Sequence, residues 1–448
     1  MRNKTLLLLT LLFSIWLQAQ EKKNSFTLNE AVDYALLHNR NVKNASLEIQ
    51  AAEQEKWETT TIGLPKIDGK IDYMNNIKTP FDLPPDDGSG EPNIFAFMFP
   101  KHSIKPDITL TQLIFDGTYI VGLQASKVFL NISRLAKEKT DNGIKQATIN
   151  AYTNACLTEK SADIMQKNIS ALKKNLEETT KIYENGLTEE ENVEQLQLTL
   201  SGLENNLQNI KNLQNITLNY VKLLLGIEPE ATINLTESLD DLVENHISLG
   251  LVNNIQSIFN SIDYQMAQND VESKRLLHKL EKYRSLPSIG GFISTNYQSF
   301  TNDSFGTLFN DNSATNGKWL NTTTAGVSIK VPIFSSFESR ARRKRTKLKW
   351  EISQNNLKEK EYQLKLDIRK AQSEYNLAIS TYENKNKSLQ LAERIENKNN
   401  IKFKEGIATS FELRQAQTQL YSSQQEYLES MMNVINKKAA LENILNIK

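Results

Sequence analysis

Two kinds of hydrophobic pattern follow each other along the chain and predict its elements. Residues 66–78, 287–300 and 322–334 alternate apolar and polar side chains with a period of two, which is typical of strands, and 104–116 is a fourth expected strand. Between the strands run long stretches poor in Pro and Gly and rich in Leu, Glu, Lys, Asn and Gln, which favour helices. The first of these helices is expected to open at the capping box Thr27-x-x-Glu30 and to reach about Thr60. The chain should therefore be mostly α with a small β part.

Two long helical hairpins are expected at about 122–226 and 338–446, with turns near 186 and 406. As one helix, the stretch before the first turn would reach roughly 95 Å. The returning helix of the first hairpin carries apolar side chains at alternating spacings of three and four, which is a coiled-coil repeat. These residues are Val193, Leu196, Leu200, Leu203, Leu207, Ile210, Gln214, Thr217, Val221 and Leu224. The matching seam from Leu413 to Ile444 is more polar, so we expect the second hairpin to face water.

The two hairpins belong to two copies of one unit. A shift of 220 residues places Gly186 on Gly406 and Ile227 on Ile447. A repeat of this length indicates a duplicated supersecondary unit, here helix, two strands, long helix and helix. We divide the chain into a first repeat at 20–227, a linker at 228–250 and a second repeat at 251–448.

The first 19 residues have the pattern of a secretory signal peptide. Arg2 and Lys4 precede an apolar stretch from Thr5 to Leu17, and Ala19 offers a small residue for cleavage. After this segment no run of about eighteen apolar residues follows, as a membrane-spanning helix would need. The exported chain is expected either to stay out of the membrane or to enter it as β-strands.

Composition argues against several classes of function. The 53 basic residues balance 53 acidic ones, which removes the global electrostatic reason to expect nucleic-acid binding. Cys156 is the single cysteine, and the four histidines are scattered, so we expect no internal disulfide and no metal site. No nucleophile motif or phosphate-binding loop occurs. We expect neither enzymatic activity nor a cofactor.

The strand count gives the first indication of an assembly. Two strands per repeat give four per chain, which cannot close a barrel, and an open edge inside a bilayer would leave backbone groups unpaired. If the strands lie in a membrane, several chains must combine them. The alternative is an ordinary half-buried sheet in a periplasmic coiled-coil adaptor or scaffold protein that does not enter the membrane.

The segment from Phe26 to Asn39, FTLNEAVDYALLHN, resembles the opening signature of the TolC family of outer-membrane efflux proteins. The tandem repeat, the strand pairs after Pro65 and Pro287 and the two Gly-containing turns match that family as well. The resemblance implies a homotrimer with a twelve-stranded transmembrane β-barrel that continues into a periplasmic α-helical barrel. It implies an exit duct in the outer membrane of a Gram-negative bacterium, contacting outer-membrane lipid and extending into the periplasm. A periplasmic adaptor protein would link this duct to an inner-membrane pump, and residues 228–250 with the termini would form an equatorial region.

The resemblance also places adaptor docking at the two hairpin turns. The residues there are Gly186, Leu187, Thr188, Gly406, Ile407 and Thr409. A structural role is compatible with docking, because Gly ends helices in the left-handed region and Thr-x-x-Glu at 188–191 and 409–412 forms capping boxes.

In related tunnels acidic residues early in the final helix narrow the periplasmic aperture. Glu412 stands at the first such position, Gln415 at the second, and Asn192 at the place of an Asp that latches the closed tip. Three Glu412 carboxylates around one axis would raise one another's pKa. The alternative for Glu412 is a capping residue that points sideways.

A basic run follows the last expected strand and includes Arg340, Arg342, Arg343 and Arg345. It would form a belt beside anionic lipid head groups or line the upper tunnel, and the alternative is a solvated helix face. An export signal argues against nucleic acid as its partner. The Pro-rich loop at 80–100 would lie on the extracellular side.

Overall fold

The computed structural model describes residues 25–78, 98–246, 258–310 and 318–447. The expected signal peptide at 1–19 and nearly all of the Pro-rich loop at 80–100 lie outside these residues. The chain forms two compact units. Unit 1 comprises the described parts of Met1–Ile49, Ser133–Ala267 and Leu357–Lys448, and unit 2 comprises those of Gln50–Ile132 and Gln268–Asn356.

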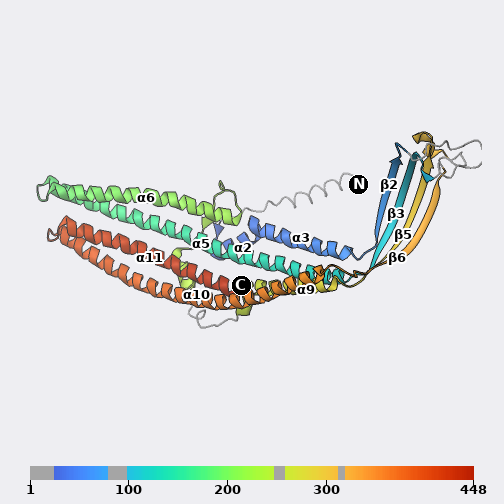
Figure 1. Cartoon of the computed structure of the whole chain (residues 1–448). Helices are drawn as coiled ribbons and strands as arrows, with labels where there is room; N and C mark the ends of the chain where they lie inside the picture. The colour runs from blue at the N-terminus through green and yellow to red at the C-terminus, as the bar shows by residue number, and fades with distance from the viewer. Residues whose placement is uncertain (1–24, 79–97, 247–257, 311–317, 448) are drawn as a thin grey trace, which may run out of the picture. The chain divides into compact units, whose positions relative to one another are not determined.

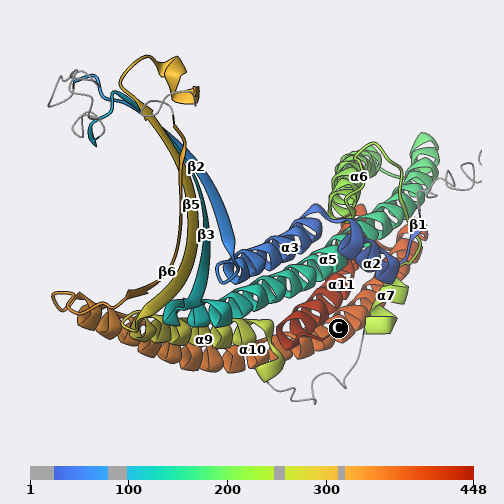
Figure 2. The ribbon, with the colours of Figure 1, turned by 90° about the vertical axis from the view of Figure 1, so that its right-hand side faces the viewer.

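Unit 2 contains a four-stranded antiparallel sheet (Figure 1, Figure 2). Its strands are β2 (Lys66–Asn75), β3 (His102–Phe115), β5 (Ser288–Thr301) and β6 (Leu320–Lys330), in the order β2-β3-β5-β6. In register, Ile108 of β3 lies opposite Thr295 of β5, and Ile289 of β5 opposite Ile329 of β6. The central β3–β5 pairing therefore joins strands that come from the two halves of the sequence.

Four helices begin or end in unit 2 and contact one another there. They are α3 (Arg40–Thr61), α5 (Gly117–Glu184), α9 (Ile262–Tyr283) and α10 (Glu338–Lys404). The Tyr119 hydroxyl of α5 donates to the Thr60 carbonyl of α3, and the Asn269 amide of α9 donates to the Val128 carbonyl of α5. Among the described helices none is long and apolar enough to cross a bilayer.

Unit 1 is built from two helical hairpins and short elements that join them. Helix α5 turns into α6 (Glu190–Leu225), and α10 turns into α11 (Ser410–Leu445). The four helices lie in the order α6, α5, α11, α10 (Figure 1). Neighbouring helices are linked by Lys173–Glu204, Asn443–Gln146 and Lys385–Glu426 contacts at 2.7, 2.5 and 2.6 Å. The short elements are α2 (Leu28–His38), α7 (Leu239–His246), η1 (Ile258–Asn260) and the parallel pair β1 (Ser25–Phe26) and β4 (Asn234–Leu235), while η2 (Phe305–Phe309) belongs to unit 2.

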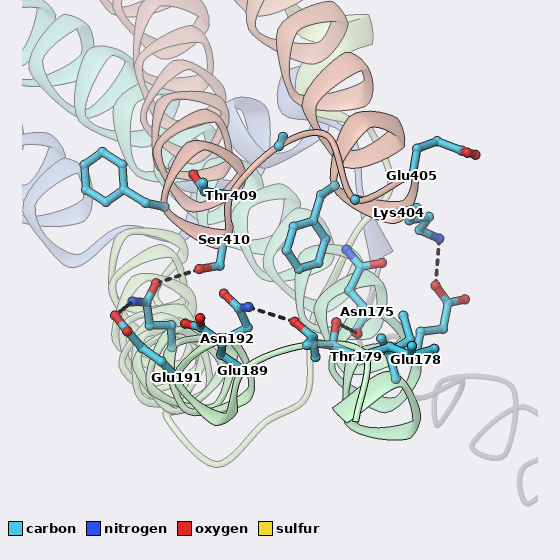
Figure 3. A pocket seen from close by; sticks show the side chains of 18 of the residues that line it. Asn175, Glu178, Thr179, Glu189, Glu191, Asn192, Lys404, Glu405, Thr409 and Ser410 are labelled. Carbon is cyan, nitrogen blue, oxygen red and sulfur yellow. Dashed lines mark hydrogen bonds and ion pairs between the residues drawn. The ribbon is translucent and has the colours of Figure 1, made fainter. Parts of the chain in front are cut away.

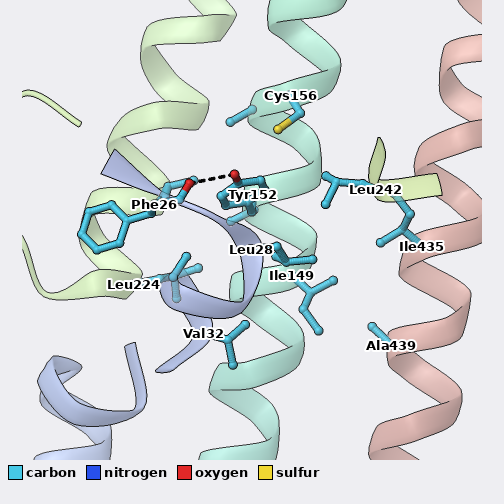
Figure 4. Close-up of a cluster of buried hydrophobic side chains, with 14 of the residues drawn as sticks. Phe26, Leu28, Val32, Ile149, Tyr152, Cys156, Leu224, Leu242, Ile435 and Ala439 are labelled. Carbon is cyan, nitrogen blue, oxygen red and sulfur yellow. Dashed lines mark hydrogen bonds between the residues drawn. The ribbon is translucent and has the colours of Figure 1, made fainter. Parts of the chain in front are cut away.

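The main core of unit 1 joins the N-terminal segment to both hairpins (Figure 4). Phe26 of β1 is fully buried, and its carbonyl accepts a hydrogen bond of 2.9 Å from the Tyr152 hydroxyl of α5. The cluster includes Leu28, Val32, Ile149, Cys156, Leu224, Leu242, Ile435 and Ala439. Because these side chains come from α2, α5, α6, α7 and α11, the core holds all five helices together.

The capping box at Thr27 and Glu30 is confirmed, but the helix it opens does not run to Thr60. Helix α2 ends at His38, and α3 begins at Arg40. Between them Asn39 has an extended ψ of 134°, and its side-chain amide donates 2.8 Å to the Leu224 carbonyl of α6. The prediction of one uninterrupted helix was wrong, because the Asn39 side-chain oxygen caps α3 by accepting 2.8 Å from the Asn41 amide and the long-range bond to Leu224 holds the break in place.

The first coiled-coil seam is confirmed, since none of its residues is exposed. The expectation that the second seam faces water was wrong, because Ser423 and Ser430 are 3% and 5% exposed. Their surroundings explain the burial of polar side chains. The Ser430 hydroxyl donates to the Tyr427 carbonyl of its own helix at 2.6 Å, and Lys437 pairs with Glu374 of α10 at 2.8 Å. These polar groups therefore have protein partners in place of water.

Candidate functional site

The two hairpin turns of unit 1 border one pocket of about 1050 Å³ (Figure 3). The end of α5 and the start of α6 form one side of the pocket, and the end of α10 and the start of α11 form the other. Its lining includes the predicted turn residues Leu187, Thr188, Gly406 and Thr409, and also Asn192. The fold therefore brings together two turns that lie 220 residues apart in the sequence.

Both turns are closed by a glycine in the left-handed region, as predicted. Gly186 has φ 72° and Gly406 has φ 71°. The residue after each glycine donates back to the last turn of the helix, Leu187 to the Ile182 carbonyl at 3.1 Å and Ile407 to the Lys402 carbonyl at 2.8 Å. This is the Schellman pattern, which satisfies the last carbonyl groups of a helix.

The second turn carries the predicted capping box. The Thr409 hydroxyl accepts from the Glu412 amide, and the Glu412 carboxylate accepts from the Thr409 amide at 2.8 Å. The hydrogen bonds from the Thr409 amide and hydroxyl lower the pKa of Glu412. The capping role of Glu412 is confirmed.

The capping box predicted at Thr188 is wrong. Helix α6 is capped at Glu189, whose side chain makes no capping hydrogen bond. In both turns the cap lies three residues after the glycine, and Thr188 comes one residue too early. Its hydroxyl instead accepts a hydrogen bond of 2.8 Å from the Asn192 side chain.

Polar contacts join the two hairpins beside the pocket (Figure 3). Lys404 of α10 pairs with Glu178 of α5 at 2.8 Å, and the Ser410 hydroxyl of α11 donates to Gln195 of α6 at 3.2 Å. The hydrogen bond from Lys404 lowers the pKa of Glu178. Sequence reasoning missed this ion pair, because no local pattern connects residues so far apart in the chain.

The lining of this pocket is mixed in chemical character. It includes carboxylates and ammonium groups together with exposed apolar side chains such as Leu187 and Phe411. Among the described residues no group of His, Cys, Asp and Glu is arranged to hold a metal ion.

Some of the predicted site residues line no part of this pocket in a single chain. Gly186 and Ile407 belong to the turns but not to the lining, and Gln415 is exposed on the first turns of α11. Glu412 also lies outside the lining.

The predicted basic belt occupies the start of α10 in unit 2. Arg342 binds Glu338 one turn earlier, and its Nε lies 3.4 Å from the Glu281 carboxylate of α9. Arg343 donates through Nε to the Ser339 carbonyl at 3.2 Å. Arg340 and Arg345 are exposed. Arg342 thus pairs with carboxylates of the chain itself, which leaves the other three arginines as candidates for the belt.

Comparison with known protein families gives a match to the second part of the chain. Residues 256–446 match the family described as outer membrane efflux protein. No curated protein matches the sequence significantly.

The fold is shared with solved outer-membrane channels. It is similar to the outer membrane protein VceC of Vibrio cholerae, with a TM-score of 0.71 and 16% identity over 93% of this chain and 95% of that one. The CmeC outer membrane channel of Campylobacter jejuni has a TM-score of 0.73 and 18% identity, with coverage of 93% and 85%. The MtrE outer membrane channel of Neisseria gonorrhoeae in its open state has a TM-score of 0.70 and 14% identity, with coverage of 93% and 88%. The family match and the fold favour the efflux protein over the periplasmic adaptor or scaffold. Residues 256–446 thus match the outer membrane efflux protein family, and the chain has the fold of solved outer-membrane channels.

Proposed function

We propose that three copies of this chain form the exit duct of a tripartite export system in the outer membrane of a Gram-negative bacterium. The duct would receive its cargo from an inner-membrane pump through a periplasmic adaptor and would conduct it across the periplasm and the outer membrane. The observation that carries this proposal is the sheet of unit 2.

Large apolar side chains of this sheet are exposed to an extent that water does not favour. Ile67, Ile71, Val327 and Ile329 are between 62% and 72% exposed. All residues of the edge strand β2 are exposed, and β6 forms the other edge. Lipid would cover the apolar side chains, and pairing of β6 with β2 of the next copy would satisfy both edges. Three four-stranded sheets would then close into a barrel of twelve strands.

The pocket at the hairpin turns supports docking of the adaptor. Leu187 and Ile407 are 78% and 75% exposed at the turns, where exposed leucine and isoleucine mark a contact surface. Gly186, Gly406, Thr188 and Thr409 would serve this surface by fixing the two turns. The adaptor would thus bind two turns whose backbone conformation is fixed and which each expose one apolar side chain.

Glu412, Gln415 and Asn192 remain the proposed aperture residues. A threefold axis next to α11 would bring three Glu412 carboxylates close together and attract cations. The observed capping bonds do not prevent this role, because the carboxylate keeps its charge while it accepts them.

Arg340, Arg343 and Arg345 are proposed to face anionic head groups at the periplasmic side of the membrane, with Arg342 holding the start of α10 in place. The guanidinium groups of such a belt favour anionic lipid by about 1 kcal/mol each.

Planar-bilayer recording tests the duct directly. The purified full-length chain should insert and give stepwise conductance, and its particles in detergent should have the mass of three chains. A protein that stays soluble as a monomer without detergent would refute the proposal.

The aperture is tested with two variants of Glu412. Glu412→Gln removes the charge but keeps an oxygen that can accept the capping bonds, whereas Glu412→Ala removes both. Weaker block of the current by a multivalent cation in both variants is expected. If the cation blocks the current of the Glu412→Gln variant as strongly as that of the parent, Glu412 only caps its helix.

A further inference from the structure

The four strands of the unit 2 sheet place all their lysines and aspartates on one face. Side chains alternate between the two faces along a strand, and residues that lie opposite each other in register share a face. Ile67 and Ile71 of β2, Ile108 of β3 and Ile329 of β6 lie on one face, where they are exposed. The charged residues on the other face are Lys66, Asp68, Lys70, Asp72, Lys105, Asp107 and Lys330. One face is therefore apolar, and the other carries the charges.

The charges on this second face alternate in sign. Along β2 every second residue is charged, in the order Lys66, Asp68, Lys70 and Asp72. Across the β2–β3 pairing, Lys70 lies opposite Asp107, and Asp72 lies opposite Lys105. The Lys70 ammonium also lies 2.9 Å from the Asp72 carboxylate. The charges of these six residues of β2 and β3 sum to zero, and we call them the balanced charge set.

Strands β5 and β6 continue this face with neutral polar side chains. The Asp107 carboxylate accepts hydrogen bonds of 2.8 Å from the Thr109 hydroxyl of β3 and from the Ser294 hydroxyl of β5. Further residues of this face are Asn296 of β5 and Thr322, Thr324 and Ser328 of β6. On these two strands only Lys330, at the end of β6, carries a charge. Across most of the sheet the charges therefore belong to β2 and β3, where they cancel.

The charged face is suited to water and the apolar face to lipid. The side chains of Lys70 and Asp72 are 71% and 51% exposed. Ionised side chains are costly in contact with lipid, whereas isoleucine and valine are favoured there. When the apolar face lies against lipid, the balanced charge set faces the interior of the barrel.

We infer that the balanced charge set lines the water-filled passage of the duct and lets cargo of either charge sign cross its membrane part. This inference rests on the proposed function and names residues that determine its specificity. A lining with a net charge attracts ions of the opposite sign and holds back ions of the same sign. Opposite charges side by side cancel each other's potential at larger distances, and salt at 0.1 M screens the remainder within about 10 Å. Neutralising one residue of the set would leave three like charges around the passage, one from each copy.

Thiol accessibility tests which face of the sheet is in water. Cys156 is the single cysteine and is 3% exposed, so the parent chain is an unreactive background. Asn296→Cys places a thiol on the charged face, opposite Asp107, and Thr295→Cys places one on the apolar face, opposite Ile108. In the membrane-inserted full chain, charged methanethiosulfonates should modify position 296 rapidly and position 295 little. Equal rates at the two positions would overturn the inference.

The charge balance is tested with a cationic and an anionic methanethiosulfonate, the trimethylammonium-ethyl and the sulfonatoethyl compound, on the Asn296→Cys chain. Asp107→Asn should lower the ratio of cation rate to anion rate by about fourfold, because opposite side chains lie about 5 Å apart. Lys105→Gln should raise this ratio by about twofold from its diagonal position at about 7–8 Å. Both substitutions together should return the ratio toward its starting value. A distortion of the sheet would shift both variants in the same direction, so opposite shifts identify the charge.

Lys330→Gln is the matched control on the same face. Lys330 lies opposite Ser288, eight residues along β5 from Asn296, which corresponds to about 26 Å. Removal of this charge should leave the ratio unchanged, because the distance exceeds the screening length of about 10 Å. Unchanged ratios in Asp107→Asn and Lys105→Gln, or an equal shift in Lys330→Gln, would refute the inference. If the parent protein inserts and conducts while this happens, the inference alone fails. If the parent protein does not insert, the proposed function fails with it.

Discussion

Gly226 offers a quantitative test of how α6 ends against α2. Its φ of 71° is left-handed, and the Ile227 amide donates 2.9 Å to the Lys222 carbonyl in a Schellman turn. A Cβ atom on residue 226 would lie 2.7 Å from the His38 carbonyl oxygen and 3.2 Å from its carbon. Both are backbone atoms, so no side-chain rotation relieves the contact.

Gly226→Ala should therefore lower the free energy of unfolding in two ways. The left-handed backbone of an alanine costs about 1–2 kcal/mol, and forcing α2 away from α6 adds about 1–3 kcal/mol. Gly406 has the same φ with no atom within 4 Å of a built Cβ, so Gly406→Ala should show the first cost alone. Gly143 lies inside α5 with open space around it, and Gly143→Ala should stabilise by about 0.8–1 kcal/mol.

Hydrogen–deuterium exchange measured by mass spectrometry reads these differences locally. In Gly226→Ala the peptides covering α2 and the end of α6 should exchange about 30-fold faster or more, which corresponds to about 2 kcal/mol. In Gly406→Ala the acceleration should be about tenfold and confined to the second hairpin turn. Equal effects of the two substitutions would refute the close contact between Gly226 and His38.

Three further predictions concern unit 1. Thr409→Ala should lower the stability of the start of α11 by about 1 kcal/mol. Thr188→Ala should have a smaller effect because Thr188 caps no helix. Hydrogen exchange at the two turns compares the two variants. Burial raises the pKa of the Cys156 thiol to about 12, so maleimide at pH 8 should modify it only in denaturant, and rapid labelling of the folded protein would contradict its burial. Burial raises the pKa of Asp263, but its hydrogen bonds from Lys139 and Lys360 outweigh that effect and hold the pKa below its usual value. The folded pKa is depressed, so this contribution to stability is present above the unfolded pKa and is lost as the pH falls through the folded one. The melting temperature of Asp263→Asn should accordingly approach that of the parent at low pH. A melting-temperature difference between variant and parent that is the same at pH 7 and pH 3 would contradict this contribution of Asp263.

The local elements could be read from the sequence because their causes are local. Apolar residues from Val193 to Leu224 recur at alternating spacings of three and four, which is the period of one face of a helix. None of the residues of this seam is exposed in the structure. The glycines at 186 and 406 end their helices because a residue without Cβ enters the left-handed region at little cost. The cap at Thr409 follows from the short reach of its hydroxyl to the Glu412 amide. The cap expected at Thr188 failed because the motif does not show at which residue the turn ends.

The joining of distant segments was decided only by the tertiary structure. Neither Pro nor Gly marks the break at Asn39. Asn39 caps α3 locally, since its side-chain oxygen accepts a hydrogen bond of 2.8 Å from the Asn41 amide, but its second bond, to Leu224, joins residues 185 positions apart. The burial of Ser423 and Ser430 likewise depends on partners that their polarity does not reveal. Glu178 and Lys404 form an ion pair only because the two hairpin turns come together. Hydrophobic periodicity and helix caps depend on residues a few positions apart and can therefore be predicted from the sequence. These long-range contacts depend instead on how the folded helices pack.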